Sequence, residues 1–368
     1  MAAVEGTEAH ASTRLGSEEG AAALPSTEPA GEGPRPRLWR ADCAGAAGAL
    51  DERGLWVSDA SVDPQDCAAL RAEIISLHAE GLLQQSGNVL AVRLPDGRRG
   101  GKAQRKPHVF EADVLAEAAM QRPDVVQRCP TLRRLLAEEG VLRRLLNDAK
   151  PALALSRLEQ AKVQVNLGRG GAFPFHFDVP AAQESSRHVT AILYLNPEWQ
   201  SPDGGEIEAL PFPFTDVAVE PLDGRLVVFS SLGTMHRVRP FAGISPRVCV
   251  NLWFEGAASV PFPRPLPAGP GLDAAVAKVV SILRQRPAEL RAFCKMWYRD
   301  AIARSFEETF EHSAELDAAL ALHAEEAKDV EARVAPQTLA LLRCSLPLQP
   351  AMEEPAGAEG LGDLFDFA

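Results

Sequence analysis

The sequence predicts an α+β protein whose core is a jelly roll or barrel of short strands, with helices before and after it. Between about residues 160 and 256 the chain consists of short strand-like runs, such as KVQVNLG and RVCVNLWF, separated by turns containing Gly or Pro. The segments on either side of this block carry apolar residues at helical spacing. We therefore expect supporting helices on the N-terminal side and a helical region on the C-terminal side.

Composition limits what this chain can bind. Its 368 residues, 46% of them hydrophobic, are enough for one large domain or two. A net charge of −12 argues against general binding to nucleic acid or to an anionic membrane. No apolar run approaches the roughly 20 residues that span a bilayer, and the acidic, polar start lacks the apolar stretch of a secretory signal. We expect neither a nucleic-acid nor a membrane partner.

The six cysteines are scattered and form no CxxC pair. They are Cys43, Cys67, Cys129, Cys249, Cys294 and Cys344. This usage favours free, mostly buried thiols in a reducing compartment. The expected location is therefore cytoplasmic or nuclear.

Local signals predict the elements that precede the strand-rich block. Residues 54–60 read as a strand, and a helix should begin at Asp63-Pro64, which provides an N-cap followed by Pro at the first helical position, and stop at Gly81. Residues 88–94 read as a second strand, followed by a Pro-Asp-Gly turn.

The basic segment 98–106 has two readings, a solvated loop or a mobile lid that guides an acidic substrate. Helical patterns follow over about 111–121 and 130–147.

Three residues of the central block form a possible metal-binding set. His176 and Asp178 are two positions apart, so on a strand both side chains point to one face, while Phe177 points to the other. His236 follows 58 residues later, at the end of another strand-like run. Two imidazoles and one carboxylate suit non-haem Fe(II) and leave coordination positions open.

Arg247 begins a strand that alternates cleanly. Arg247, Cys249, Asn251 and Trp253 share one face, so the arginine lies at the mouth of a pocket with the tryptophan deeper. A buried arginine needs an anionic partner, and a dicarboxylate co-substrate would supply one through a two-pronged hydrogen bond.

Tyr194 shares a face with Thr190 and Ile192 on another predicted strand, and its phenol could donate to the same carboxylate. Arg237 and Arg239 compete with Arg247 for this role, although neither begins a clean strand.

The segment from Lys162 to Phe254 resembles the Fe(II)/2-oxoglutarate dioxygenase domain of the prolyl 4-hydroxylase superfamily. The matching elements, in order, are His176/Asp178, the strand Arg187 to Asn196, the turn Gly204-Gly205-Glu206, the strand Pro221 to Phe229, His236, and Arg247 through Asn251 to Trp253. The arginine at the last position looks more like the intracellular oxygen-sensing prolyl hydroxylases than like the collagen-type members, which use lysine.

This resemblance implies a double-stranded β-helix (jelly roll) that holds Fe(II) through His176, Asp178 and His236. It implies that 2-oxoglutarate chelates the iron and that its far carboxylate pairs with Arg247, helped by Tyr194. The implied reaction hydroxylates a C–H bond and converts 2-oxoglutarate and O2 to succinate and CO2, with L-ascorbate as a plausible reductant. Because the carboxylate of Asp178 is present, hydroxylation is favoured over halogenation.

Three functions follow from these observations. The leading one is a protein hydroxylase that acts on prolyl residues of a protein or peptide. The alternatives are a small-molecule 2-oxoglutarate oxygenase and a non-catalytic interaction protein that senses 2-oxoglutarate or iron. The sequence does not predict the oligomeric state.

The sequence divides into six segments. They are a disordered tail (1–37), an N-terminal helical and strand support region (38–158), the Fe(II)/2-oxoglutarate dioxygenase domain (159–256), a Pro-rich connector (257–271), a helical C-terminal region (272–345) and an acidic disordered tail (346–368).

Overall fold

The computed structural model describes residues 37–179, 187–213, 216–256 and 274–346. The predicted tails and the Pro-rich connector lie almost wholly outside these ranges. Among the described residues, no helix is long and apolar enough to cross a membrane.

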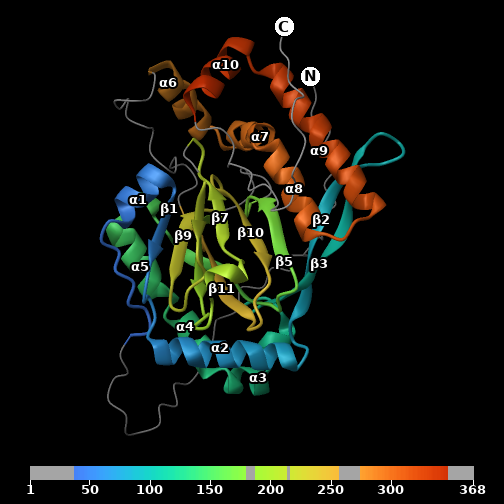
Figure 1. Ribbon diagram of the computed structural model, residues 1–368. Helices are drawn as coiled ribbons and strands as arrows, with labels where there is room; N and C mark the ends of the chain where they lie inside the picture. The colour runs from blue at the N-terminus through green and yellow to red at the C-terminus, as the bar shows by residue number, and fades with distance from the viewer. Residues whose placement is uncertain (1–36, 180–186, 214–215, 257–273, 347–368) are drawn as a thin grey trace, which may run out of the picture. The chain divides into compact units, whose positions relative to one another are not determined.

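Two antiparallel sheets form the core (Figure 1). The larger sheet has the strand order β1 (Leu55–Ser58), β9 (Leu226–Ser230), β6 (Arg187–Tyr194), β11 (Arg247–Glu255), β4 (Arg157–Asn166), β3 (Arg99–Asp113) and β2 (Gln84–Arg93). The smaller sheet has the order β5 (Gly171–His176), β10 (Met235–Phe241), β7 (Ile207–Leu210) and β8 (Val217–Val219). The predicted α+β class with a jelly-roll core is confirmed.

Strand β11 runs through the middle of the larger sheet, between β4 and β6. Its apolar face, with Val248, Val250, Leu252 and Phe254 all fully buried, belongs to the main hydrophobic core. The opposite face, which begins with Arg247, is turned toward the smaller sheet and its strands. The alternation of the sequence therefore decides which side chains reach the interior of the jelly roll.

Helices from the N-terminal part of the chain cover the outer face of the larger sheet. They are α1 (Ala46–Arg53), α2 (Pro64–Ala79), α3 (Pro123–Arg128), α4 (Pro130–Ala137) and α5 (Glu139–Ala149), with short 3-10 turns at Ala118–Gln121 and Pro151–Leu153. Helix α2 begins as predicted, since the Asp63 side chain accepts a hydrogen bond from the backbone of Gln65. It buries Leu70, Ile74 and Leu77 in the same core as the apolar face of β11.

Strands β2 and β3 form a long hairpin, which corrects two predictions. The basic segment 98–106 is not a loop, because most of it lies in β3 and pairs with β2, with Gln104 opposite Asn88. No helix starts at 111, since β3 continues to Asp113 before the first 3-10 turn. The Pro-Asp-Gly turn joins the two strands, and pairing along the hairpin outweighs the local helical pattern.

The C-terminal helices cover the smaller sheet and the hairpin, and Figure 1 shows them in orange and red, well separated from the blue and green N-terminal helices. They are α6 (Ala274–Arg284), α7 (Pro287–Trp297), α8 (Arg299–Thr309), α9 (Ala314–Arg333) and α10 (Pro336–Ser345). Helix α8 lies along edge strand β5, whose Phe175 N–H donates to Ser305 Oγ at 3.0 Å. Helix α9 contacts the hairpin through the ion pair of Arg93 with Glu325. These helices therefore flank the same side of the jelly roll as the hairpin.

Candidate active site

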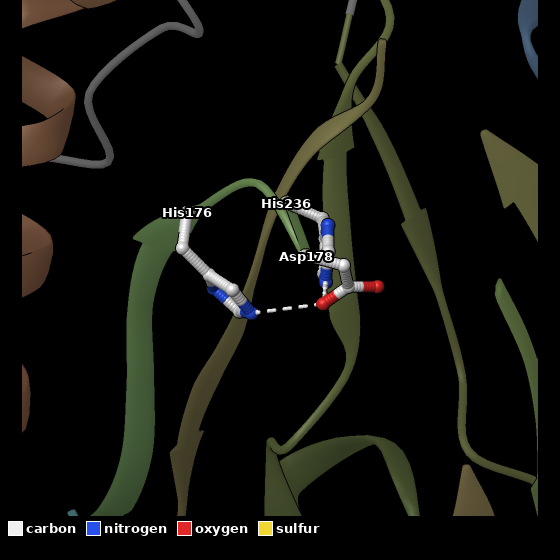
Figure 2. A group of neighbouring side chains, drawn as sticks. All are labelled: His176, Asp178 and His236. Atoms are coloured by element: carbon white, nitrogen blue, oxygen red, sulfur yellow. Dashed lines mark ion pairs between the residues drawn. The ribbon is translucent and has the colours of Figure 1, made fainter. Parts of the chain in front are cut away.

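The three predicted metal ligands meet where two strands of the smaller sheet pair. His176 ends β5, Asp178 follows two residues later, and His236 lies at the start of β10, directly opposite His176. Asp178 Oδ1 lies 3.5 Å from His176 Nε2 and 3.6 Å from His236 Nε2 (Figure 2). One possible ligand atom from each residue lies within 4.8 Å of the other two.

Backbone carbonyl groups hold both imidazole rings in place. His176 Nδ1 lies 2.9 Å from the carbonyl oxygen of Pro174, and His236 Nδ1 lies 3.1 Å from that of Thr234. Because a carbonyl oxygen only accepts, each Nδ1 carries a proton, and in the neutral form of each ring Nε2 has the free lone pair that a metal needs. Burial lowers the pKa of His236 to about 4, although Asp178 opposes the shift, so this ring is a neutral ligand.

Hydroxyl groups of the larger sheet orient the carboxylate. Thr190 Oγ1 donates to Asp178 Oδ2 at 2.5 Å and lies 2.8 Å from Ser231 Oγ. Burial alone would raise the pKa of Asp178, but the two imidazoles and the Thr190 hydroxyl outweigh burial and hold that pKa well below its ordinary value. Asp178 is therefore ionised, with Oδ2 occupied and Oδ1 directed at the imidazoles.

This donor set fits Fe(II). It consists of two imidazole nitrogens and one ionised carboxylate, the ligand set of non-haem iron oxygenases. Metal bonds to such ligands are about 2.0–2.2 Å long, so ligand atoms 3.5–3.6 Å apart can share one ion. Hydrogen bonds to the far side of each ligand fix its orientation before a metal arrives.

Arg247 is a buried cation without a carboxylate partner among the residues that the structure describes. Its side chain is 2% exposed, and its Nε donates to the carbonyl oxygen of Gly205 at 2.8 Å. Gly205 has a φ of +77°, and a Cβ there would lie 2.9 Å from Arg247 Cδ, so only glycine leaves space for the arginine. The remaining guanidinium N–H groups are suited to an anion that comes from outside the chain.

Tyr194 packs against this guanidinium and does not lie on the cavity wall. Its ring centre is 5.0 Å from Arg247 Cζ, and its buried hydroxyl makes no hydrogen bond within the described part of the chain. Burial raises the pKa of the phenol above its ordinary value, so the group is a neutral donor. Of the two neighbours, Arg247 lines the cavity and is suited to the far carboxylate of 2-oxoglutarate, whereas Tyr194 contacts the guanidinium and would act through it.

The two competing arginines are engaged elsewhere. Arg237 and Arg239 both pair with Glu208 of β7, at 2.7 Å and 2.9 Å, and neither lines the cavity that contains the triad. Of these three arginines, only Arg247 lines the cavity that contains the triad.

The triad and Arg247 line one cavity of about 210 Å³ between the two sheets. Thr190 of β6 and Asn251 and Trp253 of β11 also line it, as their strand parity predicts. The candidate iron ligands, the buried Arg247 and a further polar wall therefore share one cavity.

Four charged residues of this wall were missed by the sequence reasoning, one of them Arg187 of β6. Lys106 and Glu111 of β3 and Lys162 of β4 all line the cavity. Lys106 and Glu111 were missed because residues 98–106 were read as a loop or a lid and 111–121 as a helix, whereas Lys162 was placed on a strand but given no role in the site. The one available signal was the Pro-Asp-Gly turn, which predicts that a strand is followed by a hairpin partner.

The sequence of the strand-rich segment matches a known protein family. Residues 161–255, about a quarter of the chain, match the family model described as the 2OG-Fe(II) oxygenase superfamily. No curated protein sequence matches the chain.

Many solved structures have a similar fold. A prolyl 4-hydroxylase from Phytophthora capsici superposes with a TM-score of 0.59 and 24% identity, covering 81% of this chain and 89% of that chain. A prolyl hydroxylase from Trichoplax adhaerens superposes with a TM-score of 0.47 and 19% identity, covering 58% of this chain and 89% of that chain. A prolyl 4-hydroxylase from Pseudomonas putida superposes with a TM-score of 0.44 and 24% identity, covering 59% of this chain and 100% of that chain.

The matched segment contains the triad, Arg247 and Tyr194, and the donor set suits the iron and the co-substrate for which the family is named. Residues 161–255 therefore form a domain of the 2OG-Fe(II) oxygenase superfamily, and the protein is an Fe(II)- and 2-oxoglutarate-dependent dioxygenase.

Proposed function

We propose that this dioxygenase hydroxylates prolyl residues of a protein or peptide. The observation that carries the proposal is a second cavity of about 340 Å³, which shares the lining residues Asn88, His176 and Phe177 with the first. Its other walls come from hairpin strand β2 and from helices α7, α8 and α9. A polypeptide needs space beyond the co-substrate cavity, and this opening leads from the C-terminal helices to the first iron ligand.

The printed descriptions of the similar structures support the same substrate class. The Phytophthora capsici protein is a prolyl 4-hydroxylase, and the Trichoplax adhaerens enzyme is described in complex with a peptide fragment of hypoxia inducible factor. We carry the peptide substrate over to this chain as a proposal.

In the proposed reaction the side chains described above bind and orient. His176, Asp178 and His236 would hold Fe(II), and Arg247, with help from Tyr194, would hold the far carboxylate of 2-oxoglutarate. When bound, the iron and the co-substrate supply the oxidising power that breaks an unactivated C–H bond. Thr190 keeps Asp178 ionised and in position, and the two packed sheets limit the access of water to the site.

The test is 2-oxoglutarate turnover against a library of proline peptides, with His236→Ala as the inactive control. We expect a subset of peptides to raise succinate formation well above the rate without peptide and to gain one oxygen atom on proline by mass spectrometry. If no peptide raises turnover, the prolyl assignment is wrong. Tight 2-oxoglutarate binding without any succinate would instead favour the non-catalytic sensor.

A small-molecule substrate is the second candidate, favoured by the modest size and polar wall of the first cavity. Free amino acids and small carboxylic acids, assayed beside the peptides, would separate the two candidates.

We also propose L-ascorbate as the reductant and a cytoplasmic or nuclear location. The six cysteines are all free, four of them buried, which suits a reducing compartment. Loss of activity within a few turnovers when ascorbate is omitted would support the first proposal, and fractionation of the tagged protein tests the second.

A further inference from the structure

Lys106 is a second buried cation in the active-site cavity. It is 3% exposed and lines the same space as the iron ligands. Its ammonium donates to Asn88 Oδ1 at 2.8 Å, to Ser86 Oγ at 3.1 Å and to the carbonyl oxygen of Gly87 at 3.4 Å. These three acceptors all lie on β2 and are neutral, so they do not balance the charge.

Neighbouring charges do not balance it either. Glu111 is the nearby carboxylate, but it pairs with Lys162 at 3.0 Å. Lys106 forms no ion pair of its own with any residue that the structure describes. One glutamate therefore serves two lysines, and this corner of the cavity keeps a net positive charge. Fully buried lysines are rare unless they are paired, so the unbalanced charge needs an explanation.

Iron and co-substrate binding leave this charge in place. The lining residues of the cavity include four cations, Lys106, Lys162, Arg187 and Arg247, and two carboxylates. Arg187 is paired with Glu159 at 2.9 Å, outside the lining. The ferrous ion and the 2-oxoglutarate dianion carry equal and opposite charges, so binding both does not change the net charge. Arg247 is accounted for by the co-substrate, and Lys106 is not.

We propose that Lys106 binds a carboxylate carried by the substrate and thereby selects acidic substrates. The inference rests on the proposed hydroxylase function and adds a substrate class to it. The neutral acceptors hold the ammonium from the β2 side, and the Phe173 ring lies 4.0 Å from it. The side chain is thus fixed before the substrate arrives, as a selective site requires.

The geometry limits where the carboxylate lies along the substrate. Lys106 Nζ is 4.0 Å from the centre of the Phe173 ring, which is 6.3 Å from the centre of the His176 ring. The ammonium is therefore at most about 10 Å from the His176 ring. An extended chain advances about 3.3–3.6 Å per residue. The carboxylate should therefore lie within about three residues of the hydroxylated proline, or on the same small molecule.

The neighbouring cavity extends the same preference outward. Arg99 of β3 and Arg291 and Lys295 of α7 line it, with Glu326 of α9 as the acidic residue. A substrate that enters between the hairpin and the C-terminal helices therefore passes a wall with more cations than carboxylates, which favours an acidic segment.

The experiment uses matched pairs of substrates that differ only in charge. Short proline peptides carry a single Glu, or the isosteric Gln, at each position near the proline, and free L-proline is paired with L-prolinamide. Binding to the full-length protein loaded with Fe(II) and 2-oxoglutarate is measured without oxygen, and hydroxylation is measured with oxygen. The variants are Lys106→Gln, Lys106→Met and, as the matched control, Lys102→Gln, an exposed lysine on the same strand.

We expect the wild-type protein to bind at least one Glu peptide about tenfold more tightly than its Gln partner. The preference should disappear in both Lys106 variants and persist in Lys102→Gln. If the Lys106-dependent preference appears instead for L-proline over L-prolinamide, the carboxylate that Lys106 binds belongs to a small molecule. Thermal unfolding identifies any variant that does not fold. The comparison of Glu with Gln peptides on the wild-type protein does not depend on any variant.

The outcomes separate this inference from the proposed function. A Lys106-dependent preference in binding without hydroxylation keeps the inference and rejects the prolyl reaction. Equal hydroxylation of Glu and Gln peptides keeps the prolyl reaction and rejects the inference. If no pair shows a preference in binding or reaction, Lys106 only ties the hairpin together and the inference is wrong.

Discussion

The two sheets contribute different chemistry to one cavity. The smaller sheet supplies both imidazoles from directly paired positions on β5 and β10, with Asp178 just beyond β5. The larger sheet supplies the hydroxyl that orients Asp178 and the two buried cations, Arg247 and Lys106. Metal binding and anion binding therefore depend on different strands. Substitutions in the two sheets should cause separable losses.

The largest effect is expected in the smaller sheet. His236→Ala removes a proposed iron ligand. Because changes to groups that only orient a ligand already cost about 10–100-fold, succinate formation should fall by more than about 100-fold. Fe(II) titration and succinate assays check this. His312→Ala, an exposed histidine between α8 and α9, should change neither. Retention of even a tenth of the activity would argue against His236 as a ligand.

Arg247→Met should instead impair co-substrate binding. Removing one partner of a buried charge pair costs about 2–5 kcal/mol, so the KM for 2-oxoglutarate should rise by roughly 30-fold or more while Fe(II) affinity changes little. Without co-substrate the variant should be no less stable than the wild type, because Arg247 has no carboxylate partner among the described residues. Melting curves with and without 2-oxoglutarate test both expectations.

Arg239→Met is the matched control, since Arg239 pairs with Glu208 outside the cavity. A rise in KM for this variant comparable with that of Arg247→Met would show that the wrong arginine has been assigned to the co-substrate.

A smaller effect is expected where the larger sheet supports the metal site. Thr190→Val keeps the shape of the side chain but removes the donor to Asp178 Oδ2. Fe(II) affinity should fall by about tenfold, the lower end of the range for such orienting groups. Ser231→Ala removes the other partner of the Thr190 hydroxyl and leaves the bond to Asp178 in place, so it should have less effect. Equal Fe(II) affinity in Thr190→Val and the wild type would make this hydrogen bond irrelevant to the metal.

The sequence could predict these central residues because strand parity decides their direction. Arg247, Asn251 and Trp253 alternate with apolar residues, and the structure turns them toward the cavity. The role of Thr190 was harder to predict. Parity placed it on the inward face, but its hydrogen bond to Asp178 depends on how β5 and β6 lie across the gap between the sheets.

The hairpin could not be predicted in the same way. Lys106 and Glu111 lie in segments whose local patterns favoured a loop and a helix, and only pairing with β2 and β4 makes them a strand. Tertiary context overrides local propensity in such a strand. The part of the site that we expect to select the substrate was therefore the part least visible in the sequence.

The smallest effect, a dependence on pH, tests whether Lys106 acts through its charge. Burial lowers the pKa of Lys106 to about 8, Glu111 opposes the shift and Lys162 adds to it, while Asn88 and Phe173 are neutral. The ammonium is therefore present below about pH 8 and loses its proton as the pH rises through that value. The preference for Glu over Gln peptides should be complete well below this pH and decline above it, by at most the proposed factor of about ten.

The measurement is the ratio of kcat/KM for the paired peptides, because groups that affect both peptides equally cancel in the ratio. Lys106→Arg provides the control, since a guanidinium stays charged over the whole range. Its ratio should not change with pH. A wild-type ratio that is flat through pH 8, with a preference still present, would mean that a permanently charged group such as Arg99 or Arg291 recognises the carboxylate, and the selecting site would then lie in the neighbouring cavity.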